Sequence, residues 1–447
     1  MVGAGHAGMR LNIGIVGAGI GGLALAALLG ARGHRVTLAE RFAAPQPIGS
    51  GLVVQPVGLA VLDAIGAGEA ARALGQPIRR MIGHAGRRVV LDVSYRGGDT
   101  GLAMHRASLF AVLWQAALAA GVVLETGAEV EAVPVAGEKR HIGRHPQRLI
   151  LRRLILRRGA AALGPFDLVV DASGAGSALS PMRARPLGFG AIWGQVPWPE
   201  TSSLPPDQLT QRYFRASKMA GILPIGCLPG DATPRAAVFW SLPAAALDLW
   251  SGVKPEGGIK PEGGVKPEGG VKPEGGRDLA AWKAEAAAFW PELQPFLDAI
   301  THAGAMTPAR YAHGSLRHPY APALAFIGDA AHRASPQLGQ GANMALLDAM
   351  ALAIALDQKP LDEALPHYAQ IRRWHMRSYQ AMSAAFTPMY QSHSRVLPLI
   401  RDHVVGPLTR LWPMPALLTR LVSGDVLPPL ASTLWQRDRV PTGRTAR

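Results

Sequence analysis

The residues with the most evident chemistry begin at an apolar run near position 325. Residues 324–327 predict a strand, Gly328 ends it, and Asp329 follows the turn. A carboxylate in that place can accept hydrogen bonds from the hydroxyls of a ribose-like or ribityl chain. Asp329 is therefore a candidate ligand-binding residue.

A loop and a helix start follow this turn. Pro336, Gly339 and Gly341 let the backbone pass close to a flat ligand without an intervening side chain. Apolar residues then recur at helical spacing, which places the amides of Gly341, Ala342 and Asn343 at or near a helix N-terminus. Unpaired amides and the helix dipole favour negative charge there, and a reduced flavin carries such a charge on the pyrimidine side of its ring. The apolar residues are Ala345, Leu346, Ala349, Leu352, Ala353 and Leu356.

A second motif lies near the N-terminus. Residues 13–16 predict a strand, and an apolar helix is expected over residues 23–29. Between them Gly17, Gly19 and Gly22 form the pattern G-x-G-x-x-G. The first two glycines permit a tight turn and close approach to a pyrophosphate, and the third lets the helix pack on the strand.

The strand that follows ends in an acid. Residues 35–39 predict this strand, and Glu40 at its end can bond both hydroxyls of a ribose. Arg41, which follows directly, is included among the candidate cofactor-binding residues. The complete strand, helix, strand and acid indicate an adenine dinucleotide, without choosing between FAD and NAD.

Taken together, the pattern G-D-A-A-H, then P-x-x-G-Q-G-x-N, then D-A resembles the ribityl-binding motif of FAD-dependent aromatic hydroxylases, the para-hydroxybenzoate hydroxylase-like family that includes the ubiquinone-pathway hydroxylases. The resemblance selects FAD over NAD as the bound cofactor. The matching residues are Gly328, Asp329, Ala330, Ala331, His332, Pro336, Gly339, Gln340, Gly341, Asn343, Asp348 and Ala349.

Two further segments resemble the same family less specifically. Residues 49–58 look like the loop and helix start that pass beside the flavin ring. Residues 104–109 look like the family's h-R-x-x-L helix start, whose arginine usually contacts FAD. That arginine would be Arg106.

A third family motif departs from the pattern. The family usually carries Asp-Gly in a segment involved with both FAD and the pyridine nucleotide, but here Ser173 stands at the place of that aspartate, within D-A-S-G. This form resembles flavin-dependent halogenases and isoprenoid reductases. A halogenase is disfavoured because residues 193–197 lack the second tryptophan of W-x-W-x-I-P. NAD(P)H as the transient reductant is thus a less secure expectation than FAD.

The spacing of these motifs indicates a domain built from discontinuous segments. We expect an α/β fold with a Rossmann-like FAD-binding domain, an inserted mixed or antiparallel β-sheet substrate domain and C-terminal helices. The FAD-binding domain is assigned to residues 9–77, 100–185 and 300–357, the substrate domain to 78–99 and 186–299, and the helical region to 358–447. Four copies of (V/I)-K-P-E-G-G at 253–276 predict a flexible surface loop in the substrate domain.

The formal net charge of +15 at pH 7 invites a nucleic-acid interpretation, yet its excess is local. Eight lysines and arginines and no acid lie between Lys139 and Arg158, in an expected solvated hairpin. Stacking aromatic residues are absent there, so nucleic acid is not an expected partner. No metal site is expected, because arginines surround His141 and His145. The single cysteine, Cys227, fits a reducing compartment and a cytoplasmic location.

The C-terminal part predicts basic amphipathic helices. Apolar residues recur there at spacings of 3, 4, 4 and 3, and residues 401–447 carry seven arginines against three aspartates. Two interpretations stay open. The apolar face packs on the protein's own core, or it makes peripheral contact with a membrane, as in the ubiquinone-pathway hydroxylases. The apolar residues are Leu397, Ile400, Val404, Leu408 and Leu411.

The resemblance implies an FAD-dependent, NAD(P)H-dependent monooxygenase that uses molecular oxygen to hydroxylate an aromatic or other apolar, electron-rich substrate through a flavin hydroperoxide. Two alternatives remain: an isoprenoid reductase or dehydrogenase that inserts no oxygen, and a basic binding protein with a vestigial flavin. No substrate-side catalytic residue can be assigned, because spacing does not rank candidates such as Tyr213, His84 and Arg215.

Overall fold

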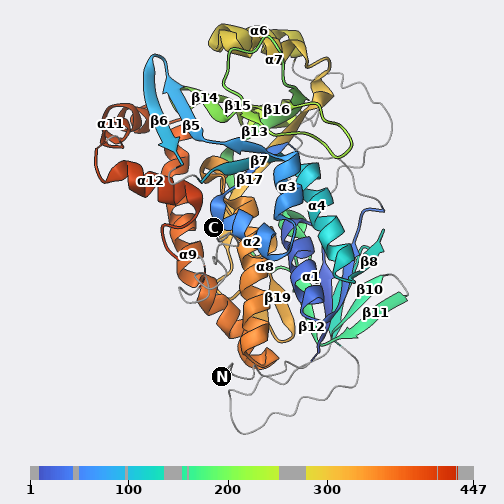
Figure 1. The fold of residues 1–447 in the computed structure, drawn as a ribbon. Coiled ribbons are helices and arrows are strands. Elements are labelled where there is room, and N and C mark those ends of the chain that lie inside the picture. The colour runs from blue at the N-terminus through green and yellow to red at the C-terminus, as the bar shows by residue number, and fades with distance from the viewer. Residues whose placement is uncertain are drawn as a thin grey trace, which may run out of the picture.

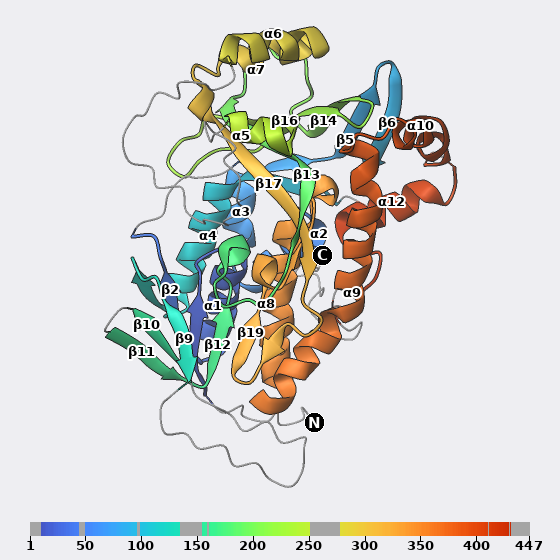
Figure 2. The same ribbon diagram turned by 180° about the vertical axis from the view of Figure 1, so that it is seen from behind.

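The computed structural model describes residues 10–43, 50–95, 99–134, 154–158, 161–250, 278–409, 411–428 and 430. The repeat at 253–276, residues 139–153 of the basic segment and residues 431–447 lie outside these ranges. Figures 1 and 2 show two main parts: a sheet flanked by helices α1, α4 and α8, and above it a second sheet with α6 and α7 on its far side.

The first part is a six-stranded sheet in the order β18-β19-β12-β1-β2-β8. All neighbouring strands are parallel except the short edge pair of β18 and β19. The strands are β1 (Asn12–Val16), β2 (Arg35–Glu40), β8 (Val123–Thr126), β12 (Leu168–Asp171), β18 (Tyr320–Ala321) and β19 (Leu324–Phe326). The predicted strand, helix and strand near the N-terminus are confirmed.

Buried helices pack beside this sheet because they are apolar on almost every face. Residues 21–29 of α1 are all buried, and so are most residues of α8. A Cβ built on Gly21 would lie 3.4 Å from the Cβ of Ala345, so the two helices approach closely. The helices of this part are α1 (Ile20–Ala31), α2 (Pro56–Ala64), α3 (Gly68–Leu74), α4 (Arg106–Ala119) and α8 (Gly341–Gln358).

The second part is an eight-stranded mixed sheet, in the order β20-β17-β13-β16-β15-β14-β5-β6. Only the pair of β14 and β5 is parallel. The strands are β5 (Arg80–Ala85), β6 (Arg88–Ser94), β13 (Arg185–Pro197), β14 (Gln208–Phe214), β15 (Lys218–Pro224), β16 (Arg235–Pro243), β17 (Met306–Ser315) and β20 (His332–Arg333). These two sheets confirm the expected fold class.

The two sheets exchange more segments of the chain than the assigned domain boundaries allow. Strand β17 lies within 300–357, the segment assigned to the FAD-binding domain, yet it pairs with β13 over residues 306–313. Sequence patterns do not reveal this pairing, because β13 and β17 are separated by more than 100 residues along the chain. The domain boundaries remain a proposal.

Two three-stranded sheets complete the β structure. One consists of β3 (Gly51–Val54), β4 (Gln76–Ile78) and β7 (Gly101–His105). The other consists of β9 (Glu131–Pro134), β10 (Leu154–Arg158) and β11 (Ala161–Phe166), all antiparallel. The described end of the basic segment is therefore a strand, and the buried Leu154 and Leu156 show that one of its faces packs inward.

Helices cover the outer face of the eight-stranded sheet (Figure 1). Trp282 of α6 and Trp290 after it are buried, and Trp282 meets Trp240 of β16 edge to face, with ring centroids 6.3 Å apart. These aromatic contacts form a second core, separate from that of the parallel sheet. The helices are α5 (Ala244–Trp250), α6 (Leu279–Phe289) and α7 (Gln294–Asp298).

The long helix α9 (Leu361–Tyr390) runs along the side of the molecule (Figure 2). It is anchored by buried polar contacts: Arg372 donates to Asp348 of α8, His375 Nε2 lies 2.8 Å from the carbonyl oxygen of Gly424, and the Tyr379 hydroxyl donates to the Leu421 carbonyl over 2.8 Å. After it come α10 (Leu397–Ile400), a π-helical turn (Arg401–Val405), α11 (Gly406–Leu408) and α12 (Met414–Ser423).

The expectation that the C-terminal apolar face packs on the protein's own core is wrong. Ile400, Val404 and Leu408 are 39%, 50% and 48% exposed. Arg401 of this segment is instead fully buried, and its guanidinium lies over the rings of Tyr213 and Tyr390 and donates to the carbonyls of residues 215 and 389. A buried arginine with several acceptors turns the apolar face outward. Among the described residues, no helix has both the length and the apolar character needed to cross a membrane.

The anchoring of α9 generates a pH prediction. Burial, reinforced by the nearby Arg372, lowers the pKa of His375 to about 3. Below pH 6.5, His375 therefore becomes protonated in the unfolded chain but stays neutral in the folded chain. The free energy of unfolding should fall as the pH drops toward 4. In H375N that dependence should be shallower, by up to about 1.4 kcal/mol per pH unit.

Urea unfolding at a series of pH values measures this difference. The matched control is H302N, because His302 is exposed and should leave the dependence unchanged. Parallel curves for H375N and the unmodified chain would contradict the assignment.

Candidate functional site

Three loops meet at the carboxyl ends of the central parallel strands. β1, β12 and β19 are adjacent, and each ends in a turn that contains candidate residues: Gly17 to Gly19, Ala172 to Gly174, and Gly328 to Asp329. In open parallel sheets, ligands bind beyond this edge. The chain thus brings the N-terminal motif and the motif about 300 residues later to one place.

The three glycines of the first turn have different physical roles. Gly17 adopts φ 102°, and a Cβ there would lie 2.6 Å from the Ala172 carbonyl oxygen. A Cβ on Gly22 would overlap the carbonyl of Gly17, so this glycine lets α1 pack on the turn. Gly19 is exposed, and a Cβ there would have Ala172 O, at 3.8 Å, as its nearest neighbour. Only Gly19 therefore borders open space.

Glu40 stands at the end of β2, where its carboxylate closes this turn. Its Oε2 accepts from the Ala18 amide over 2.7 Å and its Oε1 from the Phe42 amide over 3.1 Å. The side chain is half-buried, so lone pairs remain for a ligand. Arg41 is exposed, and its guanidinium lies 4.9 Å from the Phe42 ring centroid.

The turn after β19 is fixed by a hydrogen bond to a buried side chain of α8. Gly328 has φ 58° and donates its amide to Asp348 Oδ2 over 2.9 Å. Asp329 follows in a short 3-10 helix (Gly328–Ala330), and its side chain is exposed. The buried Asp348 thus fixes the turn that presents Asp329.

The loop before α8 also has a fixed shape. Ser335 caps the 3-10 turn Pro336–Leu338, and Gly339 closes it with φ 61°. The first hydrogen bond of α8 runs from the Met344 amide to the Gln340 carbonyl over 2.8 Å. The amides of Gly341, Ala342 and Asn343 precede it and have no intrahelical acceptor. A Cβ on Gly341 would meet nothing within 4 Å, so this helix end faces open space.

The side chain of Asn343 does not face that space. It is fully buried, its Oδ1 accepts from the Gln55 amide over 2.8 Å, and its Nδ2 donates to the carbonyls of Val53 and Gly339. Of Asn343, only the backbone amide remains available to a ligand. The side chain instead ties the start of α8 to the end of β3.

One residue that sequence reasoning did not single out is Gln55, inside the segment 49–58. Its side chain is completely buried and accepts from the Tyr95 hydroxyl over 2.5 Å. Its Nε2 donor has no partner among the described residues and lies 3.9 Å from the position of a Cβ on Gly339. A buried donor without an acceptor is costly, so it points to a missing ligand.

Arg106 lies at the first position of α4. His105 caps this helix, and the Arg106 amide donates to the Ser50 carbonyl over 3.1 Å. The Arg106 side chain is exposed, and no hydrogen bond or ion pair joins it to another described residue. Its charge is therefore free to meet an anion.

The chain is similar in sequence to known proteins that bind FAD or are named as quinolone synthases. A family model described as FAD binding domain matches residues 10–142 and 307–378. A probable 2-heptyl-3-hydroxy-4(1H)-quinolone synthase of Rhodococcus erythropolis is 27% identical over 430 residues, covering 94% of this chain and 97% of that protein.

Solved structures agree in fold. Pseudomonas aeruginosa PqsL, a probable FAD-dependent monooxygenase that has also been solved with 2-aminobenzoylacetate, superimposes with a TM-score of 0.66 at 22% identity and covers 85% of this chain and 97% of PqsL. A variant of Klebsiella pneumoniae HpxO complexed with FAD has a TM-score of 0.70 at 19% identity, with coverages of 94% and 100%. The chain is an FAD-binding enzyme that is similar to FAD-dependent monooxygenases of the aromatic-hydroxylase type.

The residues present in this chain fit FAD. Open space borders Gly19 and Gly341, unpaired amides begin α8, and the Gln55 Nε2 lacks an acceptor. Ser173, which stands where the family usually has an aspartate, has a local role. Its hydroxyl donates to Oδ1 of Asp171 over 2.6 Å, which satisfies this buried carboxylate at the end of β12.

The three substrate-side candidates lie on or directly after the paired strands β5 and β14, in different surroundings. Arg215 is exposed in the turn between β14 and β15. The Tyr213 hydroxyl donates to Gln211 over 2.7 Å, and burial raises the pKa of Tyr213 well above its ordinary value. Burial, with Arg212 and Arg80 nearby, lowers the pKa of His84. None of them is singled out by the structure as a catalytic base.

The open space at Gly19 gives a direct prediction. G19A should fold normally, because its Cβ would touch nothing closer than 3.8 Å, but the added methyl should occupy space needed by the FAD pyrophosphate. We expect FAD affinity to fall by about tenfold or more, which is about 1.4 kcal/mol.

FAD titration followed by protein fluorescence measures the affinity, and circular dichroism checks the fold. The matched control is G188A, since Gly188 is also exposed with nothing within 4 Å of its Cβ position. Unchanged FAD affinity in G19A would remove this turn from the cofactor site.

Proposed function

We propose that this protein is a monooxygenase that uses NAD(P)H and molecular oxygen to hydroxylate a small aromatic substrate, with FAD held across the carboxyl edge of the parallel sheet. The observation that carries this proposal is the convergence of the G-x-G-x-x-G turn, the Asp329 turn and the N-terminus of α8 at one edge. Each supplies a different kind of contact, and together they match one extended cofactor.

The cofactor contacts divide along its length. Glu40 would accept from the adenosine ribose, while the open space at Gly19 leaves room for the pyrophosphate at the N-terminus of α1. Gly17 and Gly22 would shape the turn and let α1 pack against it. Arg41 and Arg106 supply exposed positive charge.

At the flavin end, Asp329 would accept from the ribityl hydroxyls. The amides of Gly341, Ala342 and Asn343 would donate to the pyrimidine carbonyl and favour negative charge on the ring. Pro336 and Gly339 would lie against the ring face, and the unpaired Gln55 Nε2 would donate to it.

Bound FAD supplies the electron transfer from NAD(P)H and the activation of oxygen. The protein orients the ring and excludes water. The loop before α8 contacts the C-terminal helix α12 and strand β15. The Gln340 Nε2 donates to the Val422 carbonyl of α12 over 2.7 Å, and the Gln337 Nε2 lies 3.9 Å from the Met219 sulfur of β15. This loop would form one wall of the substrate space and β15 the opposite wall, which excludes water from the reacting atoms.

The substrate class rests on the apolar character of that sheet and on the relatives. Tyr213, Met219 and Phe239 form a buried apolar cluster on β14, β15 and β16. The Rhodococcus relative is named for a quinolone product, and PqsL has been solved with 2-aminobenzoylacetate. We infer an aromatic ring activated by an amino or hydroxyl group.

The oxygen-independent isoprenoid reductase is not favoured, because PqsL is named as a probable FAD-dependent monooxygenase and the Rhodococcus relative as a probable hydroxyquinolone synthase. The scaffold alternative with a vestigial flavin is not favoured for the same reason. We further propose a cytoplasmic location, since a single cysteine suits a reducing compartment.

The reaction is tested by spectroscopy and oxygen uptake. The purified protein should show a flavin spectrum that NADPH or NADH bleaches without oxygen and that air restores. Oxygen uptake should rise with 2-aminobenzoylacetate or an alkylated 4-quinolone. Turnover that proceeds equally well under nitrogen would contradict the monooxygenase reaction.

We also propose that the exposed C-terminal apolar face rests on an anionic membrane surface. Leu411 and Trp412 are 60% and 89% exposed and continue the face formed by Ile400, Val404 and Leu408. An amphipathic helix of this type lies in the bilayer interface, and nearby basic residues such as Arg395 and Arg420 favour anionic lipid. An apolar substrate would then enter from the lipid phase.

Sedimentation with anionic vesicles tests this contact. The triple variant I400S/V404S/L408S should lose about tenfold in vesicle binding and keep its flavin spectrum. The control is L249S, which removes an exposed leucine of α5. Failure of the unmodified chain to bind vesicles at low salt would end the membrane proposal.

A further inference from the structure

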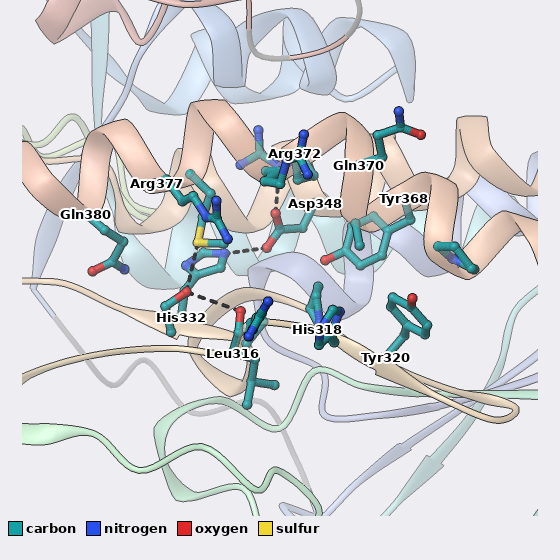
Figure 3. Close-up of a pocket in the computed structure, with 18 residues that line it drawn as sticks. Leu316, His318, Tyr320, His332, Asp348, Tyr368, Gln370, Arg372, Arg377 and Gln380 are labelled. Atoms are coloured by element: carbon teal, nitrogen blue, oxygen red, sulfur yellow. Dashed lines mark hydrogen bonds and ion pairs between the residues drawn. The ribbon is translucent and has the colours of Figure 1, made fainter.

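A cavity of about 580 Å³ lies between α9 and the segment that joins β17 to β19, and none of the proposed FAD contacts is among its lining residues. Figure 3 shows His332 and Asp348 at its base, with Arg372 and Arg377 extending from α9 on one side and His318 and Tyr320 on the other. Its size is that of a small-molecule site. None of the proposed roles in hydroxylation uses it.

The base of this cavity is a buried, fully bonded charge cluster. The Asp348 carboxylate accepts from Arg372 Nε over 2.8 Å and lies 2.6 Å from His332 Nε2. Burial raises the pKa of Asp348, but His332 and Arg372 outweigh it and bring the pKa to about 2. The carboxylate is therefore ionised and already engaged by its own partners, so it does not neutralise charges at the rim.

The rim carries three arginines. Arg317, Arg373 and Arg377 line the cavity with exposed side chains, and none of them forms an ion pair with an acid in the described part of the chain. The guanidinium groups of Arg373 and Arg377 lie 5.2 Å and 5.8 Å from the ring centroid of the exposed Trp374, so both stand near one ring on α9. With Arg372, the lining holds four arginines against the single carboxylate of Asp348.

Such an excess favours an anion, and the rest of the lining favours one that carries a ring. Arginine forks bind phosphate through paired hydrogen bonds. Pro319, Tyr320, Pro366 and Met376 add apolar and aromatic surface to the same cavity. Inorganic phosphate would leave this surface unused.

We propose that this cavity binds a small phosphate-bearing molecule, with the phosphate at Arg373 and Arg377 and an attached ring against Tyr320 and Pro366. The site is separate from the FAD contacts proposed above. Binding at this cavity requires no chemistry from the flavin, so it can be tested independently of the proposed hydroxylation.

Isothermal titration of the FAD-loaded protein tests the proposal, with 5′-AMP, adenosine and inorganic phosphate as probes. Loading with FAD keeps AMP from the cofactor's own adenosine position. We expect AMP to bind at least about tenfold more tightly than adenosine. Binding of AMP more tightly than phosphate supports a ring-bearing ligand, whereas equal binding identifies free phosphate as the source.

The variant R373A/R377A should weaken AMP binding by about tenfold or more while retaining its flavin spectrum. Both side chains are exposed, so folding should be preserved. The matched control is R87A, which removes an exposed arginine from the turn between β5 and β6. The proposal is overturned if AMP and adenosine bind alike, if neither binds at millimolar concentration, or if the double variant binds AMP as R87A does.

Discussion

One buried carboxylate, Asp348, lies where four parts of the chain meet. It accepts hydrogen bonds from the Gly328 amide and from Arg372 Nε, and it pairs with His332. These contacts join α8 to the turn after β19, to β20 and to α9. A charge removed from water in this way needs all its partners, since loss of one typically costs about 3 to 5 kcal/mol. The position of Asp329 therefore depends on a residue that never reaches the cofactor.

Asn343 has the same function on the other side of α8. Its amide side chain uses its oxygen and nitrogen to join β3, the loop at Gly339 and the start of α2. Two buried polar side chains on one helix thus fix the loops on both sides of its N-terminus. Directional hydrogen bonds set such positions more narrowly than apolar packing does.

Much of the cofactor half could be predicted from sequence because its signals are local. The spacing of Gly17, Gly19 and Gly22 sets a turn, and the apolar period after Gly341 sets a helix, whatever the rest of the chain does. Gln55 was not predicted, because its significance comes from an unpaired donor that exists only after folding. The outward orientation of Val404 was not predicted either, since it depends on Arg401 meeting Tyr213 and Tyr390 from distant segments.

Strand β17 is shared between the two halves of the molecule. It pairs with β13 of the eight-stranded sheet, and five residues beyond its end the chain enters β18 at the edge of the parallel sheet. The chain returns to the eight-stranded sheet soon afterwards, because β19 ends at Phe326 and β20, which pairs with β17, begins at His332. Two short crossings side by side restrain hinge bending between the sheets more than one would. Motions that admit substrate or release product should therefore be confined to loops and side chains, with the sheets moving as one body on the timescale of turnover.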